Sequence, residues 1–411
     1  MNKKRQVVNT TCFFDENRTM KTTDRIFQKG MALGLHVIKM KQPVKIEGEH
    51  ALQRISQILA YENCSRPLIV TGPRVSKTDF FQSLLASLNE VEVFDEVQPD
   101  PNIQLIEKMV MVYKEKECDC FIGIGGGSNM DAMKACAARI ACPNKSIPQM
   151  KGTMKIRTSL PLMIAVPTTA GTGSECTIAA VITDGNHKYS LNDPVLCPDY
   201  AILDPWTTVT MPASVTANTG MDALTHAVEA YLNTPYHQKN TAMYCENAVR
   251  LIFDNLLKAY RNPQDIEARE HMLDASYQAG LAFTVACVGN VHALAHTVGG
   301  LYHVPHGLAN AILLPIVLEA YGSRIEKELA HLARVIGMEE ADDAICTQLF
   351  IQRIRYLNQS MGIPSTFTCI EKKDLDTMAS WADQEANPLY PVPVIFTQKD
   401  FKNVLSKAGK L

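Results

Sequence analysis

The run Cys120-Phe121-Ile122-Gly123-Ile124-Gly125-Gly126-Gly127-Ser128 decides the fold class of this 411-residue chain. Its first five residues are typical of a strand buried on both faces. A helical pattern through Asp131 and Lys134 begins where the glycines end. A glycine turn between a strand and a helix exposes N–H groups that suit a pyrophosphate, although a tight turn without a ligand has the same pattern. We therefore expect a strand followed by a helix, and the turn alone leaves nucleotide binding open.

Three similar apolar runs alternate with helical patterns in the first half of the chain. The runs are Leu68–Val70, Leu162–Val166 and Ala201–Leu203, and the helical patterns are Phe80–Leu88 and Asn102–Tyr113. Alternating elements of this kind predict a parallel sheet with helices on both faces.

A second turn, residues 167–175, follows one of these runs and is rich in threonine and glycine. Its side chains Thr168, Thr169 and Thr172 could line a crevice at the carboxyl ends of the strands. Ser and Thr also cap helices routinely, so this turn alone is ambiguous. Two such turns after two strands of one sheet favour a nucleotide.

The second half of the chain predicts helix after helix, and strand signals nearly vanish from about Pro212 onward. We therefore expect an α/β domain over residues 43–208 and an all-helical domain over residues 209–411. Residues 1–42 are predicted to be a polar N-terminal arm without assigned chemistry, and residues 142–161 a surface loop. The predicted helices include Ala217–Leu232, Thr241–Tyr260, Ile266–Val285, Val291–Leu301 and Leu308–Tyr321.

Composition excludes several classes of protein. The net charge of −3 gives no broad field for nucleic acid or an anionic membrane, and no apolar run is long enough to span a bilayer. Residues 6–17, after the basic start, are too polar for a signal peptide. The 12 cysteines include no C-x-x-C pair and predict free thiols in the cytoplasm. Cys118 and Cys120 flank Asp119, and alternate residues of a strand point the same way.

Two short motifs in the second half look suited to one metal ion. Asp222 and His226 are four residues apart, as are His292 and His296, so each pair shares one helix face. His306, between a proline and a glycine, follows the second pair. A carboxylate with imidazoles suits Fe²⁺, Mn²⁺ or Zn²⁺. Spacing alone favours His292 with His296 and leaves open which three histidines join Asp222.

Four motifs in this order, at 125–134, 167–175, 220–226 and 292–307, resemble the iron-containing (group III) alcohol dehydrogenases. The resemblance covers roughly residues 43–411. It implies a Rossmann-like nucleotide-binding α/β domain and an all-helical metal-binding domain, in a dehydroquinate synthase-like architecture. The metal ligands that it implies are Asp222, His226, His292 and His306, and His296 becomes a catalytic histidine that binds no metal. The cofactor-binding residues that it implies are Gly72, Gly126, Gly127, Ser128, Thr168, Thr169, Thr172 and Lys188.

The resemblance also implies the activity: a metal-dependent alcohol dehydrogenase or aldehyde reductase that moves a hydride between a primary alcohol and NAD or NADP. The metal would lower the pKa of the alcohol, and the cofactor would carry the hydride. Iron is the expected metal, and Zn²⁺ or Mn²⁺ would suit the same ligands. The surrounding helices are rich in Ala, Leu and Val, with Phe283 nearby, which favours a small or medium apolar alcohol. A cytoplasmic homodimer or larger homo-oligomer is expected from the family.

One position departs from the family's NAD-using members, many of which carry an acidic residue after the strand at Leu68–Val70. Gly72 stands there instead, so no carboxylate would repel a 2′-phosphate. Arg74 and Lys77 are close in sequence and could contact that phosphate. We therefore expect NADP to be tolerated or preferred.

Two other functions share this architecture: a sugar-phosphate-cyclising lyase of the dehydroquinate synthase type and a polyol (glycerol-type) dehydrogenase. A cyclase would need Lys and Arg near the metal, but Asn218–Tyr236 and Val285–Val291 contain neither. A metal hydrolase would not need the two turns, and H-E-x-x-H is absent. A nucleotide-binding module without catalysis would leave the Asp and His set without a role.

Overall fold

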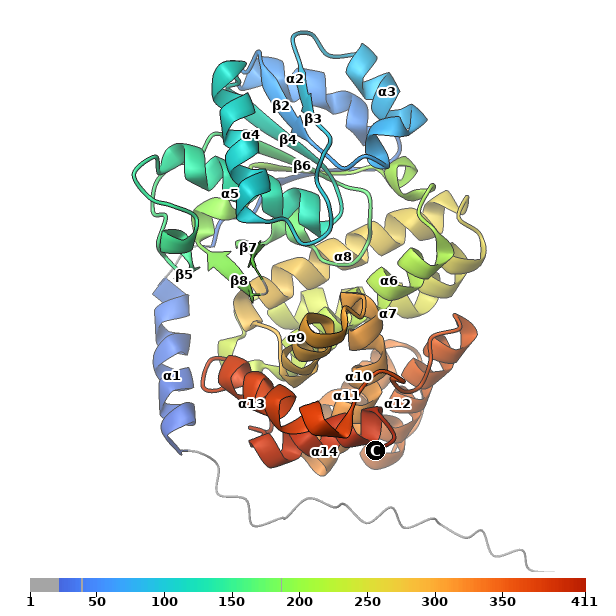
Figure 1. Cartoon of the computed structure of the whole chain (residues 1–411). Helices are drawn as coiled ribbons and strands as arrows, with labels where there is room; N and C mark the ends of the chain where they lie inside the picture. Colours follow the sequence, from blue (N-terminus) through green and yellow to red (C-terminus); the bar gives the residue numbers. More distant parts are fainter. Residues whose placement is uncertain (1–21, 38–39, 186) are drawn as a thin grey trace, which may run out of the picture.

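The computed structural model describes residues 22–37, 40–185 and 187–411. One half is a six-stranded parallel sheet with helices on both faces, and the other half is helical (Figure 1). The strand order is β1-β9-β6-β4-β2-β3, and a second sheet has the order β5-β8-β7. The predicted fold class is therefore confirmed. The strands are β1 (Val44–Glu47), β2 (Pro67–Val70), β3 (Glu92–Phe94), β4 (Cys120–Gly125), β5 (Gly152–Thr153), β6 (Leu162–Pro167), β7 (Ala179–Asp184), β8 (His187–Asn192) and β9 (Tyr200–Leu203).

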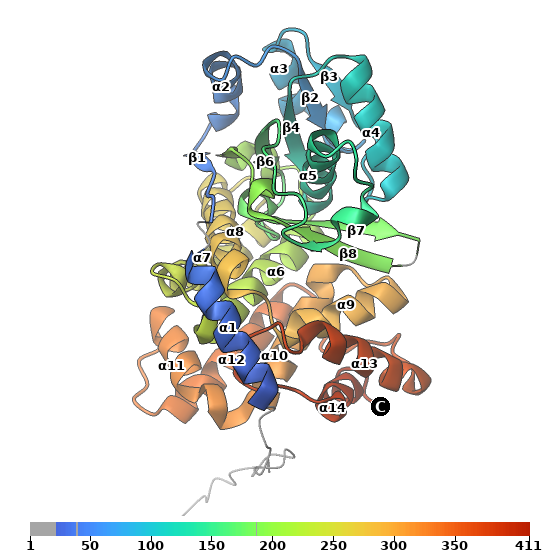
Figure 2. The same cartoon turned by 90° about the vertical axis from the view of Figure 1, so that its left-hand side faces the viewer.

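The predicted apolar runs form the middle of the six-stranded sheet. Ile69, Ile122 and Ile164 stand side by side across β2, β4 and β6. Two helices, α2 and α3, cover one face, and α4 and α5 cover the other (Figure 2). Because both faces are covered, the central strands are apolar along their whole length. The covering helices are α2 (Ile55–Tyr61), α3 (Asp79–Ala86), α4 (Ile103–Glu115) and α5 (Gly127–Ala141).

Several short strands carry too weak a pattern to be predicted. The edge strands β1 and β3 are only partly buried, and buried and exposed residues are mixed in β7. The prediction that residues 142–161 form a surface loop is wrong in part. It contributes β5 to the second sheet and buries Ile147, Met150 and Ile156 in the core beside α5. Isolated apolar residues in a polar segment have no period that would reveal this packing.

The helical half begins directly after Pro212, and each helix predicted there is present. By length and composition the stretch His306–Val335 could cross a membrane, but 67% of its most apolar window is buried inside the molecule, as in a core helix. The helices are α6 (Ala213–Leu232), α7 (Thr241–Arg261), α8 (Ile266–Ala286), α9 (Asn290–Tyr302), α10 (His306–Tyr321), α11 (Glu326–Val335), α12 (Asp343–Ser360), α13 (Leu375–Ala386) and α14 (Gln398–Ala408).

Part of the predicted N-terminal arm is a docked helix, α1 (Thr22–Val37), which runs beside the helical half (Figures 1 and 2). Arg25 donates hydrogen bonds to the carbonyls of Val392 and Pro393, and Gln28 donates to the carbonyl of Tyr390 at 2.8 Å. Residues 1–21 and 38–39 of the arm lie outside the described residues. This helix was not predicted from the apolar pattern, because polar side chains help to hold it against the helical half.

One cluster of buried apolar side chains spans both halves. Ala170, Ala201 and Leu203 of the sheet half belong to the same cluster of buried side chains as α6 to α10. Helix α8 also contacts β9 and the 3₁₀ helix η4 (Ser174–Cys176). The carboxyl ends of the strands therefore face the helical half, and this is the edge where open α/β sheets bind ligands. The predicted boundary at 208/209 falls in this shared region and stays a prediction.

Candidate metal and cofactor site

Asp222, His292 and His306 converge from three helices, α6, α9 and α10. One potential ligand atom from each lies within 4.8 Å of the others. The Nε2 atoms of His292 and His306 are 3.7 Å and 3.4 Å from Asp222 Oδ1. Asp222 and His292 are buried, whereas the His306 side chain is 40% exposed. One carboxylate and two imidazoles therefore meet at a point that is open to solvent on one side.

His226 joins the cluster from the next turn of α6. Its ring stacks on His292 with the centroids 4.5 Å apart, and on Phe283 at 4.2 Å. Its Nδ1 lies 3.3 Å from the carbonyl oxygen of Gly171. When Nδ1–H donates to that carbonyl, Nε2 is the ring atom available to a cation.

Close backbone packing explains why His306 lies over Asp222. Helix α10 begins at His306, directly after Pro305. A Cβ at Gly307 would lie 2.2 Å from the backbone oxygen of Asn218 on α6. Only glycine therefore lets α10 begin this close to α6.

Glu229, which the sequence analysis missed, fixes the orientation of His292. Its Oε2 accepts a hydrogen bond from His292 Nδ1 at 2.6 Å. The same carboxylate accepts hydrogen bonds from the backbone N–H groups of Gly289 and Val291, each at 2.7 Å. A carboxylate behind a ligand histidine sets the tautomer and the direction of the ring. Spacing could have revealed it, because Glu229 is two helical turns after Asp222.

Asn310, which the sequence analysis also missed, lies close to the converging atoms of Asp222, His292 and His306. Its Nδ2 is 2.7 Å from Asp222 Oδ1, 3.1 Å from His292 Nε2 and 3.2 Å from His306 Nε2. Its Oδ1 is buried and has no hydrogen-bond partner. Asn310 is one turn after His306 on α10, which is the same spacing that revealed the histidine pairs. An unpaired buried acceptor fits a site that holds a further group.

Burial and charge set the protonation of this cluster. Burial lowers the pKa of His306 to about 3 and that of His226 to about 4. Burial also opposes the charged form of His292, but the carboxylates of Glu229 and Asp222 outweigh it and raise its pKa to about 9. Burial opposes the ionisation of Asp222 too, yet the facing imidazoles hold the pKa of Asp222 well below its usual range. At neutral pH the cluster therefore offers a carboxylate and two neutral imidazoles.

His296 lies beside the cluster on its open side. Its ring stacks on His306 with the centroids 5.1 Å apart. Its Nδ1 donates to Glu385 Oε1 at 2.6 Å, and the Tyr390 hydroxyl donates to the same oxygen at 2.9 Å. The His296 side chain is 46% exposed. No spacing rule could have found Glu385, because it comes from α13, far along the chain.

The glycine turn and the threonine turn lie against each other. A Cβ at Gly126 would lie 3.3 Å from Thr169 Oγ1, and a Cβ at Gly127 would lie 3.0 Å from Thr172 Cγ2. Helix α5 begins here, with Ser128 in its first turn and no side-chain hydrogen bond from its N-cap residue. The first N–H groups of α5 can therefore receive an anion, as at other helix N-termini that bind phosphate.

Two further observations fit a ligand at this turn. The Thr168 N–H donates to the Gly125 carbonyl at 2.9 Å, which ties the ends of β4 and β6 together. The Asn129 side chain packs on Gly125, and its Nδ2, which is buried near Gly72, has no hydrogen-bond partner. Because an unpaired buried amide is costly, a ligand hydroxyl or phosphate oxygen there would be stabilising.

One loop joins the turn to the metal-ligand cluster. Residues 167–175 place Thr169 and Thr172 against the glycine turn and the Gly171 carbonyl against His226. A nucleotide at the turn and a cation in the cluster would therefore lie on two sides of the same loop.

The remaining predicted cofactor residues are Gly72 and Lys188, and Gly72 lies near the glycine turn, since a Cβ there would be 3.6 Å from Asn129 Nδ2. A Cβ at Gly72 would lie 2.9 Å from the Val97 carbonyl oxygen, so backbone packing requires glycine there whichever cofactor binds. Lys188, on β8, forms an exposed ion pair with Asp100 at 2.7 Å.

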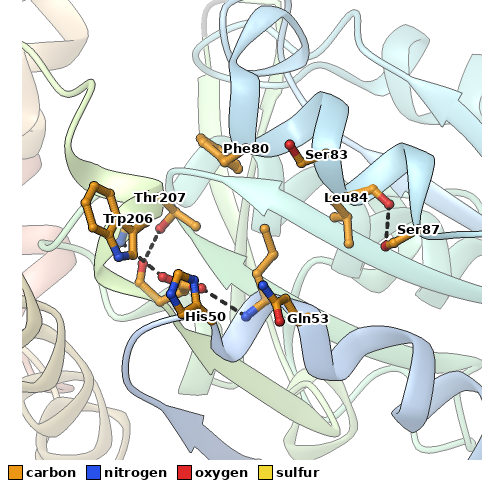
Figure 3. Close-up of a pocket in the computed structure, with 10 residues that line it drawn as sticks. His50, Gln53, Phe80, Ser83, Leu84, Ser87, Trp206 and Thr207 are labelled. Atoms are coloured by element: carbon orange, nitrogen blue, oxygen red, sulfur yellow. Dashed lines mark hydrogen bonds between the residues drawn. The ribbon is translucent and has the colours of Figure 1, made fainter.

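A separate pocket of about 490 Å³ lies after the carboxyl ends of β1 and β9 (Figure 3). Asp204 accepts hydrogen bonds there from the backbone of Leu52 and Trp206. The Thr207 hydroxyl donates to the Pro167 carbonyl at 2.7 Å, so the pocket borders the loop 167–175. Its lining contains none of the predicted site residues.

A parallel sheet with ligand-competent turns at the carboxyl ends of its strands is a fold that nicotinamide-dependent oxidoreductases use. The family profile described as iron-containing alcohol dehydrogenase matches residues 43–205. The profile of the Fe-containing alcohol dehydrogenase family, C-terminal, matches residues 216–409. The chain belongs to the iron-containing alcohol dehydrogenase family.

Individual relatives agree with this assignment. The NAD-dependent methanol dehydrogenase of Bacillus methanolicus is 32% identical over 379 residues, which cover 89% of this chain and 98% of that one. The NADPH-dependent butanol dehydrogenase of Clostridium saccharobutylicum is 36% identical over 307 residues, which cover 73% and 78%. The structure of the alcohol dehydrogenase from Oenococcus oeni matches with a TM-score of 0.87 at 31% identity, covering 90% and 100%. This chain is an alcohol dehydrogenase that uses NAD(P), and the resemblance of the four motifs is confirmed.

Proposed function

We propose that Asp222, His226, His292 and His306 hold one divalent metal ion beside a bound NAD(P), and that the enzyme oxidises small or medium apolar primary alcohols. The observation that carries this proposal is the convergence of ligand atoms from Asp222, His292 and His306 within 4.8 Å. The metal, when bound, lowers the pKa of the alcohol, and the cofactor carries the hydride. The family favours iron, although oxygen and nitrogen ligands without thiolate would also suit Zn²⁺ or Mn²⁺.

The chain's own residues bind and orient these groups. Glu229 fixes the His292 ring, and Asn310 holds the Asp222 carboxylate by its hydrogen bond. His296 is the group that we assign to proton exchange with solvent, because it is half-exposed and its Nδ1 is held by Glu385. Phe283 packs on His226 and supplies an apolar wall that suits an apolar alcohol.

The cofactor-binding assignment rests on the two turns. Gly126, Gly127 and Ser128 would bind the pyrophosphate through backbone N–H groups, and Thr168, Thr169 and Thr172 would close the crevice. Gly72 and Lys188 would contact the ribose regions, as the family resemblance implies. The lyase and polyol alternatives gain no support from relatives named methanol and butanol dehydrogenase.

Metal analysis of protein purified without oxygen, followed by a panel of alcohols and aldehydes with both cofactors, tests this proposal. We expect about one catalytic metal per chain, loss of turnover on chelation and recovery with Fe²⁺. Full turnover after complete metal removal would overturn the metal assignment.

Metal affinity is expected to rise with pH, by about tenfold per pH unit up to about pH 9. His292 has a pKa of about 9 before metal binds and must lose the Nε2 proton to become a ligand. Below that pH each metal ion therefore displaces one proton, so acid weakens binding. Titration of chelator-treated protein with Mn²⁺ at several pH values measures the slope. Glu229→Gln removes the carboxylate that raises the pKa of His292, so the metal affinity of this variant should depend less on pH. A metal affinity independent of pH in the unchanged protein would contradict the assignment of His292 as a ligand.

The double variant Arg74→Ala, Lys77→Ala is expected to raise KM for NADPH by about tenfold or more and to leave KM for NADH unchanged, since each charge-assisted hydrogen bond is worth about 1.5–3 kcal/mol. Both side chains are exposed just after β2. Steady-state kinetics with both cofactors measure the effect, with the exposed Lys116→Ala as a matched control. A large preference of the unchanged enzyme for NADH would contradict the hypothesis that NADP is tolerated or preferred.

We also propose a cytoplasmic location and a homodimer or larger homo-oligomer. All 11 cysteines in the described residues are free thiols, which suits a reducing compartment. The oligomeric state follows from the family expectation, and light scattering on the purified chain tests it.

A further inference from the structure

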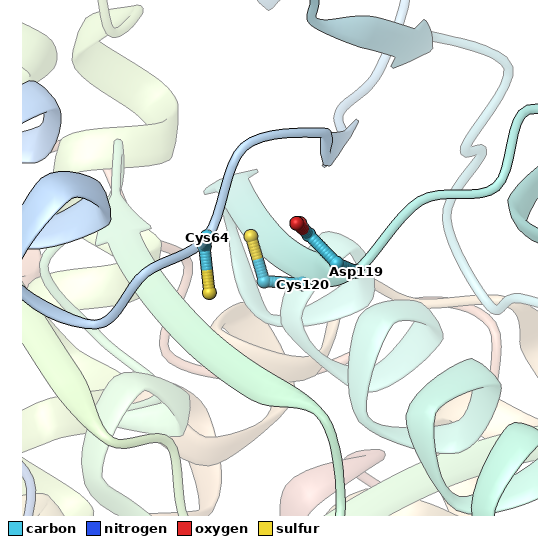
Figure 4. A group of neighbouring side chains, drawn as sticks. All are labelled: Cys64, Asp119 and Cys120. Carbon is cyan, nitrogen blue, oxygen red and sulfur yellow. The ribbon is translucent and has the colours of Figure 1, made fainter.

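Two thiols and a carboxylate meet at the amino end of β4, in the half of the chain that carries the sheet (Figure 4). We propose that Cys64, Asp119 and Cys120 form a second metal site, for a thiophilic divalent cation of the Zn²⁺ class. One potential ligand atom from each of the three lies within 4.8 Å of the others. Two sulfurs with one oxygen favour Zn²⁺ or Cd²⁺ over Mg²⁺ or Mn²⁺.

The three residues come from two segments that the sheet holds together. Cys64 lies on the connection from α2 to β2, and Cys120 begins β4, where it is paired with Pro67 of β2. Sulfur ligands of one tetrahedral Zn²⁺ are about 3.8 Å apart, given a Zn–S distance of about 2.3 Å. The two sulfurs are at most 4.8 Å apart, so rotation of the partly exposed Cys64 side chain needs to close about 1 Å at most.

The Asp119 carboxylate is held in place by hydrogen bonds. Its Oδ2 accepts hydrogen bonds from Ser65 N and Ser65 Oγ at 2.7 Å and 3.2 Å, and its Oδ1 accepts from Arg66 N at 3.1 Å. A carboxylate offers about four acceptor positions, and the fourth is taken by the Cys120 thiol. A cation that binds Cys120 as a thiolate would displace that proton and free the position. Hydrogen bonds of this kind also orient carboxylates that bind metals.

The surrounding charge favours a cation. Glu62 and Asp199 lie close enough to act electrostatically on Cys64, although Lys41 pairs with Asp199 at 2.6 Å. Burial raises the pKa of the Cys120 thiol far above its usual value. A thiol in this position remains neutral without a cation, and a bound metal ion would stabilise its thiolate.

Cys118 does not take part, which corrects the expectation that it points the same way as Cys120. Cys118 packs in the core beside α4 and α5, whereas Cys120 packs in the core beside α2 and α3. The strand begins only at Cys120, so the alternation of a strand does not extend back to Cys118.

This site is remote from the catalytic one. Cys120 and Gly125 are at opposite ends of β4, about 17 Å apart at about 3.3 Å per residue. A cation here would not take part in hydride transfer. It would tie the α2–β2 connection to β4 at the edge of the sheet that faces away from the helical half.

Cobalt substitution tests the proposal, because thiolate ligands give Co²⁺ an intense sulfur-to-metal absorption in the near ultraviolet that nitrogen and oxygen ligands do not give. Chelator-treated full-length protein is titrated with Co²⁺ under reducing conditions. We expect this absorption in the unchanged protein and in Asp222→Ala, and its loss in Cys64→Ser. Cys369→Ser, a partly buried single cysteine elsewhere, is the matched control and should retain it.

The outcomes are distinct. No sulfur absorption in the unchanged protein, or absorption that survives in Cys64→Ser, overturns the proposal. If circular dichroism shows that Cys64→Ser is misfolded, Cys120→Ala provides the same comparison. Failure of the catalytic metal proposal would instead appear as unchanged turnover in Asp222→Ala, so the two failures cannot be confused.

Discussion

Replacing His306 with alanine is expected to lower bound metal and alcohol oxidation together. Loss of one ligand of four opens the site, and the metal supplies several kcal/mol of stabilisation in the transition state. Because about 1.4 kcal/mol corresponds to a factor of ten, we expect kcat/KM to fall by about a thousandfold or more. Metal content per chain and steady-state kinetics on the same preparation measure both effects.

A neighbouring histidine provides the control. His303 is exposed, lies three residues before His306 and has a positive φ of 55°. Asparagine tolerates that backbone conformation, so His303→Asn removes an imidazole without strain and should retain metal and activity. If the His306→Ala enzyme remained fully active while binding little metal, the metal mechanism would be wrong. Full metal content in that variant would instead contradict the ligand assignment.

The central strands and the long helices could be predicted because their burial is periodic or continuous. The runs at 68–70, 120–124, 162–166 and 201–203 all lie in β-strands. Edge strand β1 and helix α1 could not be predicted in this way. No residue of β1 is buried, and the docking of α1 uses the hydrogen bonds of Arg25 and Gln28. A pattern of apolar residues carries no information about such contacts.

The residues of the metal cluster could be predicted in part. Spacing on a helix identified Asp222 with His226 and His292 with His296, but it could not say which histidine turns toward Asp222. That depends on the start of α10, where Gly307 allows the close approach that places His306. Glu229 and Asn310 share helix faces with these residues and could have been found by extending the same rule.

The hydrogen-bond partners of His296 could not be predicted from residue spacing. Glu385 and Tyr390 are close to each other in sequence, yet they reach His296 only through the packing of α13 on α9. The same packing directs His296 Nδ1 to Glu385. Under the proposed function, this tertiary contact would leave one member of an i, i+4 pair available for proton exchange instead of metal binding.

His296→Ala is consequently expected to retain metal and to lose turnover, with kcat lower by about a hundredfold to ten-thousandfold, the range for loss of a general acid or base. The residue is half-exposed, so added imidazole can reach the space and should restore part of the activity. Glu385→Ala removes the acceptor at Nδ1 and should cost about tenfold, again with metal unchanged, because it acts only through the ring. Metal analysis and kinetics with and without imidazole measure these effects. Loss of metal from His296→Ala would instead indicate that His296 is a ligand. The choice between His296 and His306 as a ligand would then be open again, as it was from spacing alone.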